Sequence, residues 1–130
     1  MFIDASALLA ILQQEPEADT LADAIEAAPY RCTSPLAMFE TVAGLMRQRN
    51  VARVVAEEHL RAVLTVARIE IVPLTDEIGR AALDAFDRYG KGRGHPAQLN
   101  MADCFAYACA KTQHLPLLYK GDDFSRTDLA

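Results

Sequence analysis

Short apolar runs alternate with longer segments of helical periodicity along this chain, and the alternation limits its fold more than any other feature. The apolar runs at residues 1–3, 30–33, 69–74 and 115–119 are expected to be strands. Helices are expected over residues 5–14, 17–28, 35 to 47 or 49, 51–68, 76 to about 89, and 101 to about 112. Strands that alternate with helices predict a parallel sheet covered by helices on both faces.

Local signals mark several of these boundaries. Ser34 followed by Pro35 is typical of a helix N-cap with proline at the first helical position. Thr75 and Asn100 are expected to cap the last two helices. The segment GKGRGHP between those helices is glycine-rich and basic, so it is expected to be an irregular loop. With 130 residues, of which 52% are apolar, we expect a single domain spanning residues 1–130.

Composition excludes several classes of protein. No stretch is long and apolar enough for a bilayer span, and the N-terminus lacks the basic flank of a signal peptide, so we expect a cytoplasmic protein without membrane contact. The three cysteines include no CxxC pair and the histidines no HExxH motif, which argues against a disulfide framework and a zinc site. The formal net charge of −5 argues against binding nucleic acid through overall charge, but it permits a local basic patch.

Three acidic residues lie where a parallel sheet places its functional groups. Asp4 directly follows the first expected strand, although it could equally serve as an N-cap. Asp122 and Asp123 follow the last expected strand, in a Gly-Asp-Asp turn that by itself indicates only a turn. Because sites in such sheets form beyond the carboxyl ends of the strands, these acids are candidates for one site.

Two more acids lie on apolar helix faces. The neighbours of Glu40 one turn away are apolar, and no lysine or arginine lies within a turn. Asp103 is the only charge in MADCFAYACA, a segment apolar enough to be buried. Each acid has a structural alternative: Glu40 could reach solvent, and the charge of Asp103 in the first helical turn could interact favourably with the helix dipole. Carboxylates gathered without a basic partner nevertheless predict a bound cation, and oxygen ligands favour Mg²⁺ or Mn²⁺. A metal of this kind activates water and stabilises phosphoryl charge, which is nuclease chemistry.

Four segments in order resemble one known family. They are FIDASALLAIL, SPLAMFETVAGL, GRGHPAQLNMADCFAYACAK and LPLLYKGDDF. The chain resembles PIN-domain ribonucleases, and specifically VapC-type toxins of toxin–antitoxin pairs, over essentially its whole length. The resemblance implies a three-layer α/β/α sandwich with a short parallel sheet. It also implies a homodimer, inhibited by a cognate antitoxin whose tail enters the active-site groove.

The same resemblance implies a Mg²⁺-dependent endoribonuclease, the toxin of a type II pair, that hydrolyses RNA with a metal-activated water; Mn²⁺ could substitute. Its implied catalytic residues are Asp4, Glu40, Asp103 and Asp123. Asp4 and Asp103 resemble the principal metal ligands, while Glu40 would help to bind metal or position water. The family's segment usually ends in Asp-Phe, which favours Asp123 for the fourth acid over Asp122, although either could bind the metal.

RNA binding requires cations close to these acids. The candidate cations are Arg88, Lys91, Arg93, His95 and Lys120, and Ser6 could hydrogen-bond a metal ligand or a bound phosphate. Each has an alternative: the residues of the basic loop could simply be solvated, Lys120 could pair with Asp122, and Ser6 could cap a helix.

Other functions compete with this reading. A catalytically inactive, dimeric RNA- or protein-binding module would tolerate alanine at the acidic positions. A phosphotransferase with an aspartyl nucleophile would fit Asp4, but Ser6 stands where a second acid is expected. No P-loop and no glycine-rich turn after the first strand is present, which argues against nucleotide triphosphatases and dinucleotide-binding enzymes.

Overall fold

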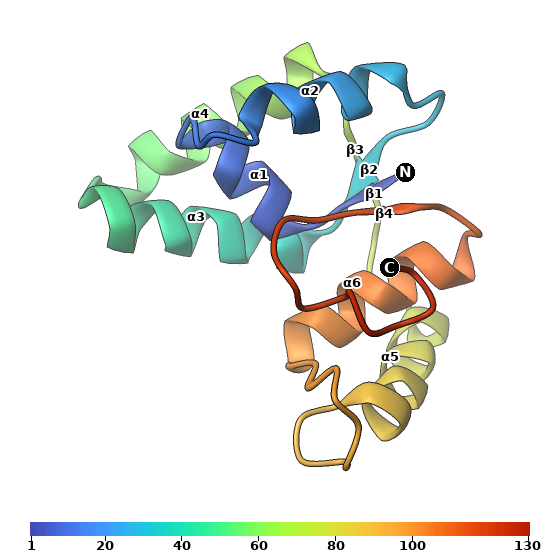
Figure 1. Ribbon diagram of the computed structural model, residues 1–130. Helices are drawn as coiled ribbons and strands as arrows, with labels where there is room; N and C mark the ends of the chain where they lie inside the picture. The colour runs from blue at the N-terminus through green and yellow to red at the C-terminus, as the bar shows by residue number, and fades with distance from the viewer.

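The computed structural model describes residues 1–130 as six helices around a four-stranded sheet (Figure 1). The strands are β1 (Phe2–Ile3), β2 (Cys32–Thr33), β3 (Glu70–Ile71) and β4 (Leu117–Leu118). The helices are α1 (Ala5–Leu12), α2 (Ala18–Ala27), α3 (Pro35–Arg49), α4 (Arg53–Val66), α5 (Asp76–Tyr89) and α6 (Met101–Thr112). No helix is long and apolar enough to cross a membrane.

The sheet is parallel throughout, with the order β3-β2-β1-β4, which confirms the topology expected from the alternating pattern. Phe2 of β1 is in register with Cys32 of β2 on one side and with Leu117 of β4 on the other. The strands are shorter than expected. At the edge strand β3, pairing ends with the bond from the Val72 amide to the Thr33 carbonyl (2.9 Å), because the chain leaves β2 and begins α3 at Pro35.

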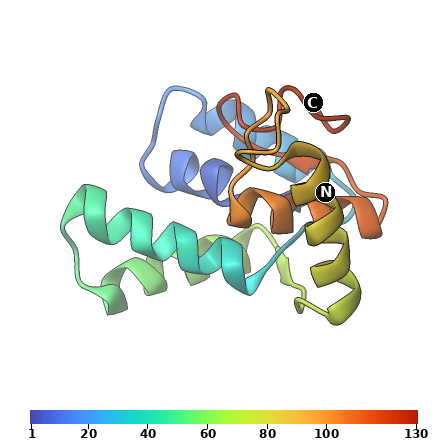
Figure 2. The ribbon, with the colours of Figure 1, turned by 90° about the horizontal axis from the view of Figure 1, so that it is seen from below.

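Helices cover both faces of the sheet, so the expected three-layer α/β/α arrangement is confirmed. Phe2 packs into a core shared with α5 and α6, whereas Ile3 packs into a second core shared with α1, α2 and α4. Successive residues of a strand point to opposite faces, so two adjacent residues anchor both layers. The helix α3 contributes to both cores, and it forms with α4 a hairpin that projects from the body of the molecule (Figure 2).

Two expected helix ends, those of the first and fourth helices, lie two residues too late, because these helices terminate without glycine. The first helix ends at Leu12 rather than at residue 14, and α4 covers Arg53–Val66 rather than 51–68. Gln14, Arg68 and His114 adopt left-handed backbone conformations, with φ between 53° and 55°. The next residue in each case donates its amide to the carbonyl five positions earlier, the Schellman pattern. Side chains other than glycine give no sequence signal for this motif.

The C-terminal segment returns across α5 and α6. Asp128 accepts hydrogen bonds from the hydroxyl of Tyr107 (2.6 Å) and the ammonium group of Lys111 (2.7 Å). These donors lower the pKa of Asp128 to about 2. The three cysteines are free and buried. The tail therefore packs against the later turns of α6, whereas Asp103 lies in its first turn.

Candidate functional site

The carboxyl edge of the sheet positions four acidic side chains that are far apart in sequence. Asp4 follows β1 directly, and Glu40 lies on α3, which begins just after β2. Asp103 is in the first turn of α6, and Asp123 lies in the loop after β4. The negative charges of these residues act on one another, as described below, so they form one group, called here the acidic cluster.

Asp4 is both the N-cap of α1 and a member of the acidic cluster. Its Oδ2 atom accepts hydrogen bonds from the backbone amide (3.0 Å) and the hydroxyl (2.6 Å) of Ser6. The residue is only 5% exposed. Burial raises the pKa of Asp4, while the hydrogen bonds from Ser6 partly oppose the rise. The structural and functional interpretations of Asp4 are therefore compatible.

Asp103 is fixed by a reciprocal cap at the start of α6. Asn100 Oδ1 accepts a hydrogen bond from the Asp103 amide (2.8 Å), and Asp103 Oδ2 accepts one from the Asn100 amide (3.0 Å). This capping box confirms Asn100 as the N-cap. Asp103 is 8% exposed, and burial raises its pKa to about 6, with further contributions from the charges of Asp123 and Asp4.

The pKa of Glu40 is also strongly raised. Burial raises its pKa to about 7, and repulsion from Asp4, Asp103 and Asp123 adds to the rise. None of the four acids takes part in an ion pair within the chain. The acidic cluster consequently carries a negative charge that nothing else in the chain neutralises.

The two aspartates after β4 differ in their relation to the acidic cluster. Both are exposed. Besides burial, the charge of Asp123 contributes to the raised pKa of Asp4, Glu40 and Asp103, whereas that of Asp122 contributes to none of them. Asp123 therefore faces the acidic cluster more closely than Asp122 does.

The donor set fits a hard divalent cation. All four side chains offer oxygen, the ligand that Mg²⁺ and Mn²⁺ prefer, and their mutual repulsion would be relieved by a positive charge. No three acidic, histidine or cysteine side chains are arranged closely enough to hold a metal ion by themselves. Mg²⁺ usually keeps several waters and needs only one or two carboxylates, so the chemistry of the group still suits it.

Ser6 and Lys120 interact with other groups of the chain instead of being free for a substrate. Ser6 Oγ donates to Asp4 and accepts a hydrogen bond from the Lys120 amide (3.0 Å). The Lys120 ammonium group pairs with Glu15 and, at 3.3 Å, with Glu17. Pairing with Asp122, the sequence-based alternative, is therefore wrong. Sequence reasoning missed both glutamates because a separation of 105 residues between Glu15 and Lys120 gives no local signal.

The basic loop projects beyond the end of α5 and leads into the capped turn of Asp103 (Figure 1). Its base is closed by hydrogen bonds between Leu99 and the backbone at residues 89 and 91. Arg88 lies over the ring of Tyr89 (4.6 Å), and Arg93 pairs with Asp87 (2.9 Å). Lys91 is exposed and forms no ion pair.

His95 belongs to the internal structure of this loop. Its Nδ1 atom accepts a hydrogen bond from the Ala97 amide (3.0 Å), and its ring meets the ring of Tyr89 edge-on. Only the other ring nitrogen of His95 therefore remains for a ligand.

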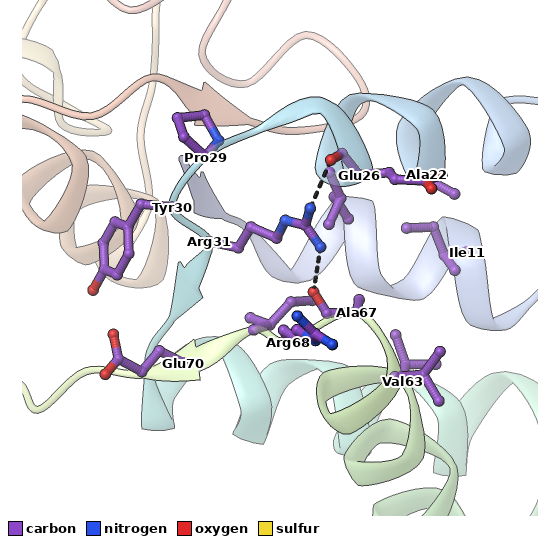
Figure 3. A pocket seen from close by; sticks show the side chains of 13 residues that line it. Ile11, Ala22, Glu26, Pro29, Tyr30, Arg31, Val63, Ala67, Arg68 and Glu70 are labelled. Atoms are coloured by element: carbon purple, nitrogen blue, oxygen red, sulfur yellow. Dashed lines mark hydrogen bonds between the residues drawn. The ribbon is translucent and has the colours of Figure 1, made fainter.

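A cleft of about 850 Å³ lies at the opposite, amino edge of the sheet. Arg31 donates hydrogen bonds across it to the carbonyls of Glu26 (2.6 Å) and Ala67 (2.7 Å), so it joins the ends of α2 and α4 (Figure 3). The acidic residues of the cluster do not line this cleft. Its size therefore says nothing about the chemistry at the carboxyl edge.

The chain is similar to known proteins over nearly its whole length. The PIN domain profile matches residues 1–129. A VapC ribonuclease of Rhizobium meliloti is 42% identical, with 98% of each chain covered. Ribonuclease VapC28 of Mycobacterium tuberculosis is 38% identical, with 98% of this chain and 93% of the relative covered.

Solved structures show the same fold at lower identity. VapC20 of Mycobacterium tuberculosis, described as a toxin that cleaves the sarcin–ricin loop, matches with a TM-score of 0.73 at 16% identity, covering 95% of this chain and 92% of that chain. A toxin–antitoxin complex from Klebsiella pneumoniae contains a chain with a TM-score of 0.71 at 19% identity, covering 98% and 92%.

Proposed function

Because the chain belongs to the PIN-domain family and to its VapC branch, we propose that it is a Mg²⁺-dependent endoribonuclease and the toxin of a type II toxin–antitoxin pair. One observation supports the activity above the others. Four carboxylates with no basic partner gather at the carboxyl edge of the sheet, and burial with mutual repulsion raises the pKa of Glu40 to about 7. Mn²⁺ is expected to substitute for Mg²⁺.

The hydrogen bonds and the burial of the four acids suggest a different role for each. Asp4 and Asp103 are held rigidly by Ser6 and Asn100 through Oδ2, which leaves Oδ1 of each to bind metal. Glu40 holds a proton more readily than an ordinary glutamate, which suits a group that orients a water and accepts its proton. Asp123 would complete the metal site, since its charge acts on the other three. When bound, the metal would lower the pKa of water and stabilise negative charge on the phosphate.

The RNA backbone would approach along the basic loop. Lys91 is the cation of this loop with no partner in the chain, so it is the best candidate for a direct phosphate contact. To bind a phosphate, Arg93 would have to break its ion pair with Asp87, whereas Arg88 lies over the ring of Tyr89. His95 would act through the ring nitrogen that its loop contact leaves unused.

A homodimer and a cognate antitoxin complete the proposal. The groove between α5 and α6, about 530 Å³, is bordered by Leu83 and Met101, which are 69% and 66% exposed. Apolar side chains exposed to this degree on neighbouring helices are typical of an interface between proteins. Size-exclusion chromatography with light scattering of the isolated chain tests the dimer.

The activity is tested with purified chain freed of any partner, labelled total RNA, and either Mg²⁺ or EDTA. We expect cleavage that requires the metal and is lost in Asp103→Asn. The side-chain oxygen of the new asparagine can still accept a hydrogen bond from the Asn100 amide at the start of α6, so the cap and the fold are expected to be kept. If the variant cleaves like the wild type, the catalytic assignment is wrong, and a binding module without catalysis becomes the better account.

A matched pair tests the fourth acid. Asp123→Asn is expected to abolish cleavage, whereas Asp122→Asn, the same change one residue away, is expected to retain it. The opposite result would assign the fourth position to Asp122.

A further inference from the structure

The loop that carries Asp123 is tied to both ends of α1. After β4, the Lys120 amide donates to the hydroxyl of Ser6 in the first turn of this helix (3.0 Å). The Lys120 side chain then extends to Glu15 and Glu17, just beyond the last turn. These four residues, Ser6, Glu15, Glu17 and Lys120, are called here the Lys120 latch.

The Lys120 latch holds the residue just before the loop turns. Gly121 follows with φ of 95°, a conformation that side chains rarely adopt, so the chain turns there. On the far side of the turn, Phe124 is buried (1% exposed) and packs edge-on against Tyr119, with ring centroids 5.1 Å apart. Asp123 therefore lies in a short span between one charged anchor and one apolar anchor.

The partners of Lys120 are themselves well placed to act as an anchor. The Glu15 amide donates to the Ala10 carbonyl (2.9 Å) in the motif that ends α1, so the backbone of this glutamate is fixed. The Lys120 and Glu15 side chains are 35% and 30% exposed, which shields their ion pair from solvent more than a fully exposed pair. Ser6 links the same anchor to Asp4 through its own hydroxyl.

We propose that Lys120 is a positioning residue: through Glu15 and Glu17 it holds the loop so that Asp123 faces the acidic cluster, and it does not contact the RNA. The role in cleavage rests on the function proposed above, whereas the effect on the loop does not. An ammonium group bound to two carboxylates is poorly available to a phosphate, and its ion pairs point it toward the end of α1 rather than toward the acidic cluster.

Two variants break the ion pairs of the Lys120 latch from opposite sides. Lys120→Met removes the cation, and Glu15→Gln/Glu17→Gln removes both partners while leaving the cation in place. The matched control is Glu57→Gln/Glu58→Gln on α4, which makes the same change in charge and also breaks ion pairs, with Arg53 and Arg61. Lys120→Arg keeps a cation and should preserve the contact.

Hydrogen exchange of the amides at residues 119–124 is measured first, because it needs no activity. Both disrupting variants should speed exchange of the Lys120 amide about two- to fivefold, the range of a partly exposed ion pair, while the control and Lys120→Arg stay at the wild-type rate. Unchanged exchange in both disrupting variants would overturn the proposal. If the wild type cleaves no RNA, the proposed function fails, and this measurement still decides whether the Lys120 latch exists.

If the protein cleaves RNA, the kinetics of cleavage distinguish a positioning role of Lys120 from a direct contact between Lys120 and RNA. Both disrupting variants should raise the Mg²⁺ concentration needed for half-maximal cleavage by a similar factor, about two- to fivefold. The salt dependence of KM for RNA should not change. If Lys120 contacted a phosphate, Lys120→Met alone would raise KM and reduce the salt slope by about one, and freeing the cation in the glutamine variant would not impair cleavage. That pattern would overturn the proposal.

Discussion

Replacing Glu40 by glutamine should stabilise the metal-free protein at alkaline pH. Burial, with repulsion from three aspartates, raises the pKa of Glu40 from 4.5 to about 7. The folded state therefore binds a proton more tightly than the unfolded state, and stability falls as the pH rises from 4.5 to 7. Above pH 7 the full penalty is present. Glutamine has nearly the same shape and no charge, so it removes the penalty.

The size of the effect follows from the pKa shift. A shift of this extent corresponds to about 3 kcal/mol, and because Glu40 is partly exposed, solvent screening reduces it to about 1–2 kcal/mol. At pH 8 in EDTA, Glu40→Gln should therefore unfold at a temperature about 3–8 °C higher than the wild type. At pH 4.5 the two proteins should differ by less than about 0.5 kcal/mol, because Glu40 is then protonated in the fold.

Thermal and urea unfolding at pH 4.5 and pH 8, each with EDTA, measure both predictions. Glu58→Gln, the same change at an exposed site on α4, is the control and should alter stability little at either pH. Adding Mg²⁺ at pH 8 should stabilise the wild type more than Glu40→Gln, since the metal neutralises the charge that the variant lacks. Equal stability of variant and wild type at pH 8, or a gain of the same size at pH 4.5, would refute the reasoning.

Three further changes test the surrounding structure. Asp128→Asn should lower the free energy of unfolding by about 1–2 kcal/mol, because it weakens the contact with Tyr107. Since the pKa of Asp128 is lowered in the fold, the stability that its carboxylate contributes is present above pH 4 and lost toward pH 2, and urea unfolding across this range would detect the loss. Gly90→Ala should cost at least about 1 kcal/mol, because a Cβ atom there would lie 2.4 Å from the Phe86 carbonyl oxygen; thermal unfolding measures it, and an unchanged melting temperature would contradict the geometry. Arg31→Met should cost about 2–3 kcal/mol by leaving the carbonyls between α2 and α4 without a donor, and equal urea midpoints for variant and wild type would count against that role.

Much of the fold was predictable because its signals are local. The caps Ser34, Thr75 and Asn100 each satisfy backbone amides within a few residues, so the sequence places the starts of α3, α5 and α6 correctly. The strand-to-helix alternation likewise implies the parallel sheet. Two helix ends were less predictable, because Gln14 and Arg68 close Schellman motifs where glycine is the usual signal.

The acidic cluster, too, has features that the sequence predicts and features that only the tertiary structure shows. The positions of Asp4 after a strand and of Asp103 in a capped, apolar helix are visible in the sequence, and so is the isolation of Glu40 on an apolar face. The closer approach of Asp123 than Asp122 to these acids depends on how the loop after β4 turns at Gly121. The pairing of Lys120 with Glu15 and Glu17 has no sequence signal at all.

The sequence by itself determined which elements form, where three helices begin, and which carboxylates lie at strand ends or on apolar faces. These properties depend on interactions within a few residues and on the periodicity of apolar side chains. Only the tertiary structure decided which acids act on one another, how strongly the pKa of Glu40 rises, and what Lys120 binds. Those outcomes depend on charges and burial contributed by segments far apart in the sequence, which no local pattern encodes.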